Sequence, residues 1–133
     1  MFVDASALIA LGHPPDGHHA AATEYYRDLA NEVRLVASDY VFGETVTVLQ
    51  RLAGHRIAVQ KGQALRASQR FHWSKVTDAD LEEAWGLFER NKEGMGFTDC
   101  TIVAQMRRLG IESIFTFDGA FRKAGVKVVP GKA

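Results

Sequence analysis

The chain has 133 residues, of which 47% are hydrophobic and 24% are charged. This composition is typical of a globular domain and excludes a disordered or collagen-like chain. The 16 Lys and Arg residues balance the 16 Asp and Glu residues, so net charge gives no long-range attraction to nucleic acid or to an anionic membrane. We therefore expect a single domain over residues 1–133 that holds any polyanionic partner through local contacts.

Cysteine use and hydropathy indicate a protein of the cytoplasm. Cys100 is the only cysteine, so no internal disulfide can form. The N-terminal residues do not combine a basic region, an apolar core and a cleavage site. The apolar runs are also shorter than the roughly 20 residues that cross a bilayer. We expect a cytoplasmic protein without a membrane segment.

Short apolar runs alternate with helical patterns along the chain. Strands are expected at residues 1–3, 33–37, 71–76, 114–117 and 126–129, of which 71–76 has the weakest pattern. A short helix is expected directly after Asp4, and longer ones at 18–32, 39–52, 60–69, 77–90 and 98–109. Trp73, Trp85 and the phenylalanines are assigned to the core. The alternation predicts an α/β fold with three layers, α/β/α, around a mostly parallel sheet of about five strands.

Two aspartates follow predicted strands. Asp4 comes directly after the first strand, and Asp118 directly after the segment IFTF. In an open α/β sheet, ligands bind beyond the carboxyl ends of the strands, where the strand order reverses. We expect these two carboxylates to meet at that edge if their strands flank the reversal.

Two further acids lie within helical patterns. Asp99 precedes Ile102 and Val103 by three and four residues, so it shares their apolar face. Glu44 lies within the apolar segment YVFGETVTVL. Neither position is expected to face solvent.

Each acid also has a simpler interpretation. Asp4, Asp99 and Asp118 could each cap a helix, and Glu44 could pair with Arg51. Four buried carboxylates, however, need cationic partners or a metal, and no matching set of Lys or Arg stands beside them. Clustered oxygen ligands suit Mg²⁺ or Mn²⁺, which we expect as the cofactor.

Four segments occur in the order FVDASALIAL, SDYVFGETVTVL, GFTDCTIVAQMRRLG and IFTFDGAF. Together they resemble the four signature regions of PIN-domain ribonucleases. The short chain is also similar to the VapC-type toxins of bacterial toxin–antitoxin pairs. The resemblance covers essentially the whole chain, and FTDCTIVAQMRRLG followed by FTFD is its most specific part.

The resemblance implies a PIN-like fold and a metal-dependent endoribonuclease whose products carry a 5′ phosphate and a 3′ hydroxyl. It also implies an RNA substrate, a cognate antitoxin and a homodimer. Ser6 and Thr98 match hydroxyl residues of the family and are expected to bond to water or to the substrate phosphate. The residues matched to the family's metal-binding acids are Asp4, Glu44, Asp99 and Asp118.

Basic residues are the candidates for holding RNA phosphates, since the chain as a whole is neutral. They are Arg51, Arg56, Lys61, Arg66, Arg70, Lys92, Arg107, Arg108, Arg122 and Lys123. A solvated helix face explains such residues equally well, so none is assigned to the site. The alternative to a nuclease is a non-catalytic module with the same fold that only binds nucleic acid or protein.

Overall fold

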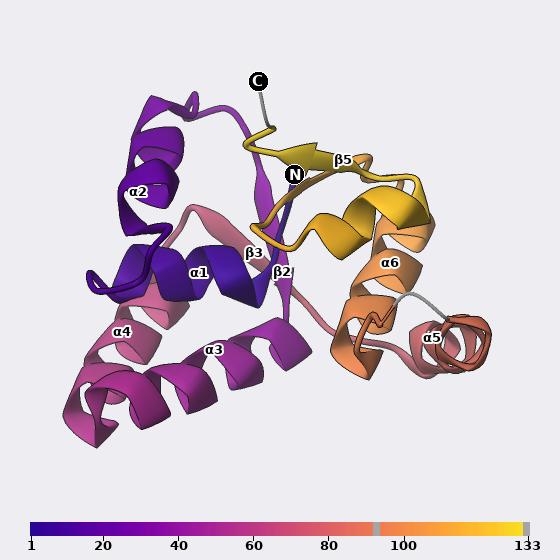
Figure 1. Ribbon diagram of the computed structural model, residues 1–133, viewed down its shortest axis with the longest axis horizontal. Coiled ribbons are helices and arrows are strands. Elements are labelled where there is room, and N and C mark those ends of the chain that lie inside the picture. The colour runs from indigo at the N-terminus through magenta and orange to yellow at the C-terminus, as the bar shows by residue number, and fades with distance from the viewer. Residues whose placement is uncertain (92–93, 132–133) are drawn as a thin grey trace.

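The computed structural model describes residues 1–91 and 94–131, so the predicted contact of Lys92 lies outside the described residues. A parallel five-stranded sheet lies between helices on both sides, as Figure 1 shows. The strands are β1 (Phe2–Val3), β2 (Leu35–Ser38), β3 (Phe71–Ser74), β4 (Ser113–Phe115) and β5 (Lys127–Val129). The predicted α/β fold is confirmed, including the weak strand near residue 71.

The helices form the two outer layers. They are α1 (Ala5–Gly12), α2 (His19–Asp28), α3 (Asp39–Ala53), α4 (His55–Ala67), α5 (Asp78–Arg90), α6 (Phe97–Leu109) and the 3₁₀ helix η1 (Gly119–Ala124). In Figure 1, α1 to α4 lie on one side of the sheet, and α5 and α6 on the other. Among the described residues, no helix is both long and apolar enough to cross a membrane.

Helix boundaries differ from prediction at two places, and η1 was not predicted. Helix α4 begins at His55 rather than at residue 60, because Gly54, at φ 93°, ends α3 and lets the next helix start at once. Helix α2 ends at Asp28, four residues before the predicted end. The first turn of α4 is largely polar and η1 is short, so neither shows the apolar spacing by which a helix is predicted.

Strand β1 lies at the centre of the sheet, whose order is β3-β2-β1-β4-β5. The order reverses between β1 and β4, where Phe2 pairs with Ile114 and Val3 with Phe115. The pairing continues one residue further, because the backbone N–H of Asp4 donates to the carbonyl of Phe115 at 3.0 Å. The expected reversal therefore lies directly beside Asp4.

The core is built mainly from the central strands, α1 and α6. Seven consecutive residues of α6, from Cys100 to Met106, are buried. Trp85 and Phe88, however, are 53% and 39% exposed, so their assignment to the core is wrong. With Phe97 they form an aromatic cluster whose ring centroids lie 5.7 to 6.2 Å apart. Their helical spacing correctly indicated an apolar face of α5. It could not indicate that this face stays exposed in the described part of the chain.

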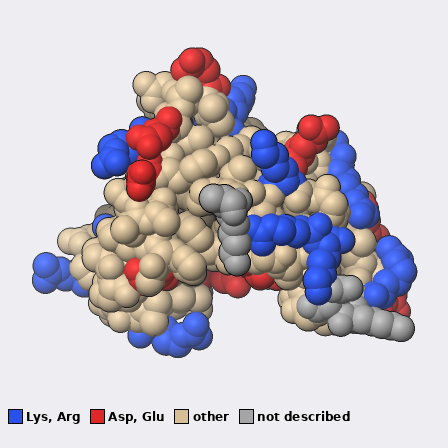
Figure 2. All heavy atoms as spheres, turned by 45° about the horizontal axis from the view of Figure 1, so that its top comes forward, with Lys and Arg blue, Asp and Glu red and all other residues tan. Residues whose placement is uncertain are grey.

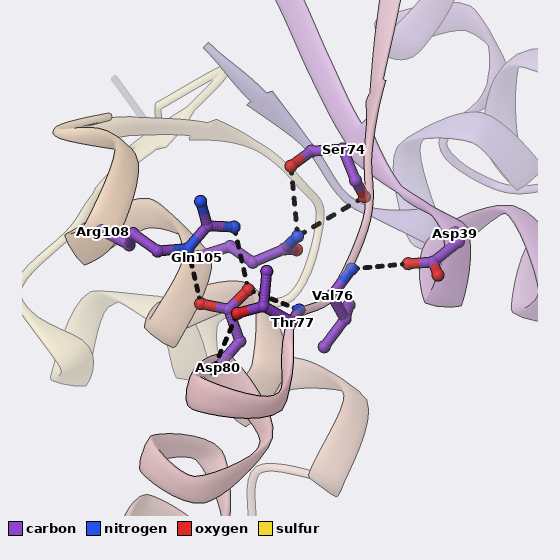
Figure 3. A network of polar contacts seen from close by, with 7 residues as sticks. All are labelled: Asp39, Ser74, Val76, Thr77, Asp80, Gln105 and Arg108. Carbon is purple, nitrogen blue, oxygen red and sulfur yellow. Dashed lines mark hydrogen bonds and ion pairs between the residues drawn. The ribbon is translucent and has the colours of Figure 1, made fainter.

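A polar network ties α5 to α6 (Figure 3). Arg108 donates to both carboxylate oxygens of the buried Asp80, at 2.8 and 2.9 Å. Thr77 and Asp80 also form a reciprocal capping box at the start of α5. The hydrogen bond from the Arg108 guanidinium holds the pKa of the Asp80 carboxyl below its usual range.

Replacing Asp80 is expected to destabilise the fold more than any exposed ion pair does. Asp80→Asn should cost about 2 kcal/mol at neutral pH, because it leaves Arg108 without its bidentate partner. The matched control is Glu83→Gln, which removes an exposed pair with Arg107 and should cost less than about 0.5 kcal/mol. Urea denaturation of the three proteins measures both values.

The lowered pKa of Asp80 also fixes the pH range of this effect. The extra stability of the wild type is full above the ordinary pKa of an aspartate. It is lost as pH falls through the lowered pKa of the folded state, so the two proteins should converge in strong acid. Equal costs for Asp80→Asn and Glu83→Gln at neutral pH would contradict this account.

Candidate active site

Asp4 is a buried carboxylate at the end of the central strand. It is 4% exposed and occupies the N-cap position of α1, yet its side chain makes no capping hydrogen bond. Instead its Oδ2 accepts hydrogen bonds from Ser6 Oγ at 2.9 Å and from Thr116 Oγ1 at 2.8 Å. The capping interpretation is therefore wrong for Asp4, which is held by two hydroxyl groups.

Thr116 is the residue of this site that sequence reasoning missed. It is 1% exposed, lies 3.0 Å from Ser6 Oγ and accepts from the backbone N–H of Asp118 at 3.0 Å. Ser6 Oγ in turn accepts from the N–H of Phe117 at 3.1 Å. The available signal was a hydroxyl within IFTF, two residues before Asp118 and so on the same side of an extended chain.

Asp118 lies at the start of η1, and the prediction that it directly ends the strand is wrong. Strand β4 stops at Phe115, and Asp118 follows after two more residues. Its Oδ1 accepts from the N–H of Ala120 at 2.9 Å, so it caps η1 as the simpler interpretation proposed. After β4, the hydroxyls of Ser6 and Thr116 accept from the backbone N–H groups of Phe117 and Asp118.

Asp99 lies in the first turn of α6 and is partly buried. Its Oδ2 accepts from the N–H of Gly96 at 3.2 Å, so Asp99 also has a capping role. Burial raises the pKa of its carboxyl to about 7, helped by the charges of Asp4, Asp118 and Glu44. A capping hydrogen bond lowers the pKa of a carboxyl, because it favours the charged form. Capping alone therefore does not account for the burial and the negative charges that raise the pKa of Asp99.

Glu44 projects from α3 and is exposed, so the expectation that it avoids solvent is wrong. Apolar neighbours in the sequence did not imply burial, since only one face of α3 packs on the core. Partial desolvation, with the nearby charge of Asp4, still raises the pKa of the Glu44 carboxyl. Glu44 therefore lies within electrostatic range of the buried acid.

The two predicted hydroxyl residues have different surroundings. Ser6 is engaged with Asp4, Thr116 and the turn before η1, which gives it a supporting position. Thr98 is partly buried beside Asp99, and its carbonyl accepts from the hydroxyl of Thr101. A contact of Thr98 with substrate stays a prediction.

The four acids share one electrostatic environment. Burial raises the pKa of Asp4, opposed by its hydroxyl hydrogen bonds, and the charge of Asp118 raises it further. The charges of Asp4, Glu44 and Asp118 each raise the pKa of at least one other acid of the four, and all three act on Asp99. In the described part of the chain, the ion pairs join Arg27 to Asp28, Arg107 to Glu83 and Arg108 to Asp80, and none includes these four carboxylates.

The donor set suits a hard divalent cation. Within residues 1–91 and 94–131, no three His, Cys, Asp or Glu side chains approach closely enough to form a ready cage. The site does offer carboxylate and hydroxyl oxygens without a cationic partner, and both hydroxyls bond to the same oxygen of Asp4. Such oxygens are the preferred ligands of Mg²⁺ and Mn²⁺, so the residues fit the expected cofactor.

The basic residues differ in their engagement. Arg108 is bound to Asp80, and Arg70 donates to the carbonyl of Ala30 while lying over the ring of Tyr26. These two have structural partners. Other predicted phosphate contacts are exposed, namely Arg51, Arg56, Lys61, Arg66, Arg107, Arg122 and Lys123.

Known proteins share both the sequence pattern and the fold. The model of the PIN domain matches residues 1–127. The chain belongs to the PIN-domain family. Two relatives from Mycobacterium tuberculosis, strains CDC 1551 and H37Rv, are each named 23S rRNA-specific endonuclease VapC20 and are 41% identical to it over 98% of both chains.

A solved PIN-domain structure matches as well. The crystal structure of Mycobacterium tuberculosis VapC20, described as a sarcin-ricin loop cleaving toxin, superposes with a TM-score of 0.87 at 36% identity. The match covers 94% of this chain and 95% of that one. The resemblance to PIN-domain proteins that the four segments indicated is confirmed.

Replacing Asp99 is expected to stabilise the metal-free protein at alkaline pH. Because the folded pKa is raised, the penalty of its charge appears above the ordinary value of 3.8 and is full above about 7. Asp99→Asn should gain about 1 kcal/mol near pH 8, since partial exposure screens part of the shift. The gain should vanish near pH 4, and an amide oxygen can still accept from Gly96.

Added Mn²⁺ should make the wild type more stable than Asp99→Asn. It stabilises the wild type by mass action and the variant much less. Thermal melts of both proteins with chelator and with Mn²⁺ measure the two shifts. Equal Mn²⁺ shifts would leave Asp99 with its capping role only.

Proposed function

We propose that this PIN-domain protein is an Mg²⁺- or Mn²⁺-dependent endoribonuclease that hydrolyses phosphodiester bonds of RNA. The observation that carries the proposal is the buried Asp4 carboxylate, which has no cationic partner among the described residues and has three more acids within electrostatic range. A fold that retains such uncompensated charge needs a cation to complete it.

The positions of the residues support a proposed role for each. Asp4, Glu44 and Asp99 are proposed to hold the principal cation, and Asp118 to complete or tune the site. A divalent cation supplies Lewis acidity that activates the attacking water and neutralises charge on the phosphate. Ser6 and Thr116 keep Asp4 oriented. Thr98, in the first turn of α6, is proposed to contact the substrate phosphate.

The substrate proposal comes from the relatives. Their names state an endonuclease specific for 23S rRNA, and they match nearly the whole chain. We propose 23S rRNA as the substrate of this protein also, and the cytoplasm as its location. The products would carry a 5′ phosphate and a 3′ hydroxyl.

The alternative is a non-catalytic module that uses the PIN fold only for binding. The presence of all four acids favours a nuclease, because a binding surface for RNA gains nothing from buried, uncompensated negative charge. Metal-dependent cleavage separates the two.

Replacing the acids should remove cleavage without removing the fold. Asp4→Asn, Glu44→Gln and Asp99→Asn are each expected to abolish detectable cleavage, and Asp118→Asn to weaken it, because each removes a charge that holds the cation. The measurement is incubation with total RNA and Mg²⁺ or Mn²⁺, with and without chelator, followed by mapping of new ends. Wild-type cleavage by both Asp4→Asn and Asp99→Asn would exclude the proposed site.

The proposed partners are a second copy of the chain and a cognate antitoxin. We propose that a basic side chain of the antitoxin enters the acidic site, where the local negative potential attracts it. Sedimentation at micromolar concentration should give a dimer, and a monomer would remove the dimer from the proposal. The antitoxin should bind Asp4→Asn more weakly than wild type, as measured by calorimetry, and equal affinity would exclude entry into the site.

A further inference from the structure

A pocket lies between α5, α6 and η1, and Cys100, the residue after Asp99, is part of its lining. Its volume is about 200 Å³. Buried apolar or weakly polar side chains such as Cys100 and Val103 line its interior. Three exposed cationic residues, Arg90, Arg107 and Lys123, also line it. We call it the cationic pocket.

Helix α6 and the 3₁₀ helix η1 each carry one of the four acids and part of the cationic pocket. On α6, Cys100 directly follows Asp99, and Arg107 lies two turns further along the helix. At about 1.5 Å per residue, Asp99 and Arg107 are separated by about 12 Å along the axis. On η1, Asp118 caps the first turn, and Lys123 lies near the other end. An RNA strand that leaves the acids along these elements reaches the pocket within a few nucleotides.

Two arginines near this path have guanidinium groups that lie over glycines. A Cβ atom added at Gly86 would come 3.2 Å from Nη1 of Arg90, and one at Gly119 would come 3.0 Å from Nη1 of Arg122. The guanidinium of Arg122 therefore lies over the first residue of η1, and that of Arg90, a residue that lines the pocket, lies against α5. Any larger residue at either glycine would displace these groups.

The half of the molecule that contains the cationic pocket also carries many basic side chains. Figure 2 shows several Lys and Arg side chains on the half of the molecule that contains η1, α6 and β5. Arg107 pairs with Glu83 at 3.2 Å, but both side chains are about half exposed, and such a pair is weak enough to exchange for a phosphate. The acids would repel an RNA backbone wherever no cation is bound, so attraction must come from beside them.

We propose that the cationic pocket binds a backbone phosphate of the RNA a few nucleotides from the scissile bond. Arg90 and Lys123 are its principal contacts, and Arg107 is the third. The proposal rests on the proposed function, since it names how that site holds its substrate. The contact positions the strand without reading its sequence.

The test uses the double variant Arg90→Gln/Lys123→Gln and the charge-retaining variant Arg90→Lys/Lys123→Arg. The probe is labelled 23S rRNA fragments, bound in chelator so that no cleavage occurs. For the Gln variant, the dissociation constant should rise about tenfold at low salt, and the slope of log affinity against log salt should fall by about 0.7 to 1. The charge-retaining variant should keep the wild-type slope.

Two controls keep the result specific. Arg27→Gln removes a cation from α2, on the other side of the sheet, and should leave affinity and slope unchanged. In the cleavage assay, the Gln variant should raise KM and keep kcat within about twofold, since the contact exists both before and during reaction. Replacing single phosphates by methylphosphonates should find one position that weakens binding by wild type and not by the Gln variant.

The outcomes separate this inference from the proposed function. If wild type cleaves RNA and the Gln variant keeps the same KM and salt slope, the cationic pocket binds no phosphate and the inference is overturned. If wild type binds RNA through the pocket but cleaves none in Mg²⁺ or Mn²⁺, the inference stands and the proposed function fails.

Discussion

The site depends on one carboxylate that the fold buries without a countercharge. Burying an ionised group costs several kcal/mol unless hydrogen bonds or an opposite charge compensate it. Among the described residues, Asp4 is compensated by hydrogen bonds from the hydroxyls of Ser6 and Thr116 and from the backbone N–H of Ala5. Those hydroxyls also hold the turn that carries Asp118. The hydroxyls of Ser6 and Thr116 therefore hold both the Asp4 carboxylate and the segment that follows β4.

Much of this arrangement could be predicted from sequence because it follows from strand ends. Apolar runs indicated the parallel strands, and the rule for parallel sheets brought Asp4 and Asp118 to one edge. What could not be predicted is side-chain environment. Glu44 is exposed although its sequence neighbours are apolar, and Trp85 is exposed although its spacing is that of a core residue. Thr116 was not predicted, because a single buried hydroxyl residue does not belong to the apolar spacing that reveals strands and helices.

Helix α6 carries a residue of the acidic site, a large part of the core and an ion pair to α5. Its first turn presents Asp99 to the acids, its middle is buried on all sides, and its last turn gives Arg108 to Asp80. The helix then stops at Gly110, whose φ of 68° only glycine adopts readily. The fixed end near α5 restrains the whole helix, because a buried helix cannot rotate without repacking. The position of Asp99 therefore depends on the packing of the whole helix as well as on its own hydrogen bond from Gly96.

The four acids come from four different parts of the fold. Asp4 follows β1, Glu44 lies within α3, Asp99 lies in the first turn of α6, and Asp118 precedes η1. If several of them hold the proposed cation, it would join segments that are distant along the chain, as a reversible cross-link does. Opening of any one segment would then require release of the ion. The local openings through which proteases attack a folded chain would become rarer as the cation concentration rises. The lifetime of the protein in a cell would thereby depend on the ion that its chemistry uses.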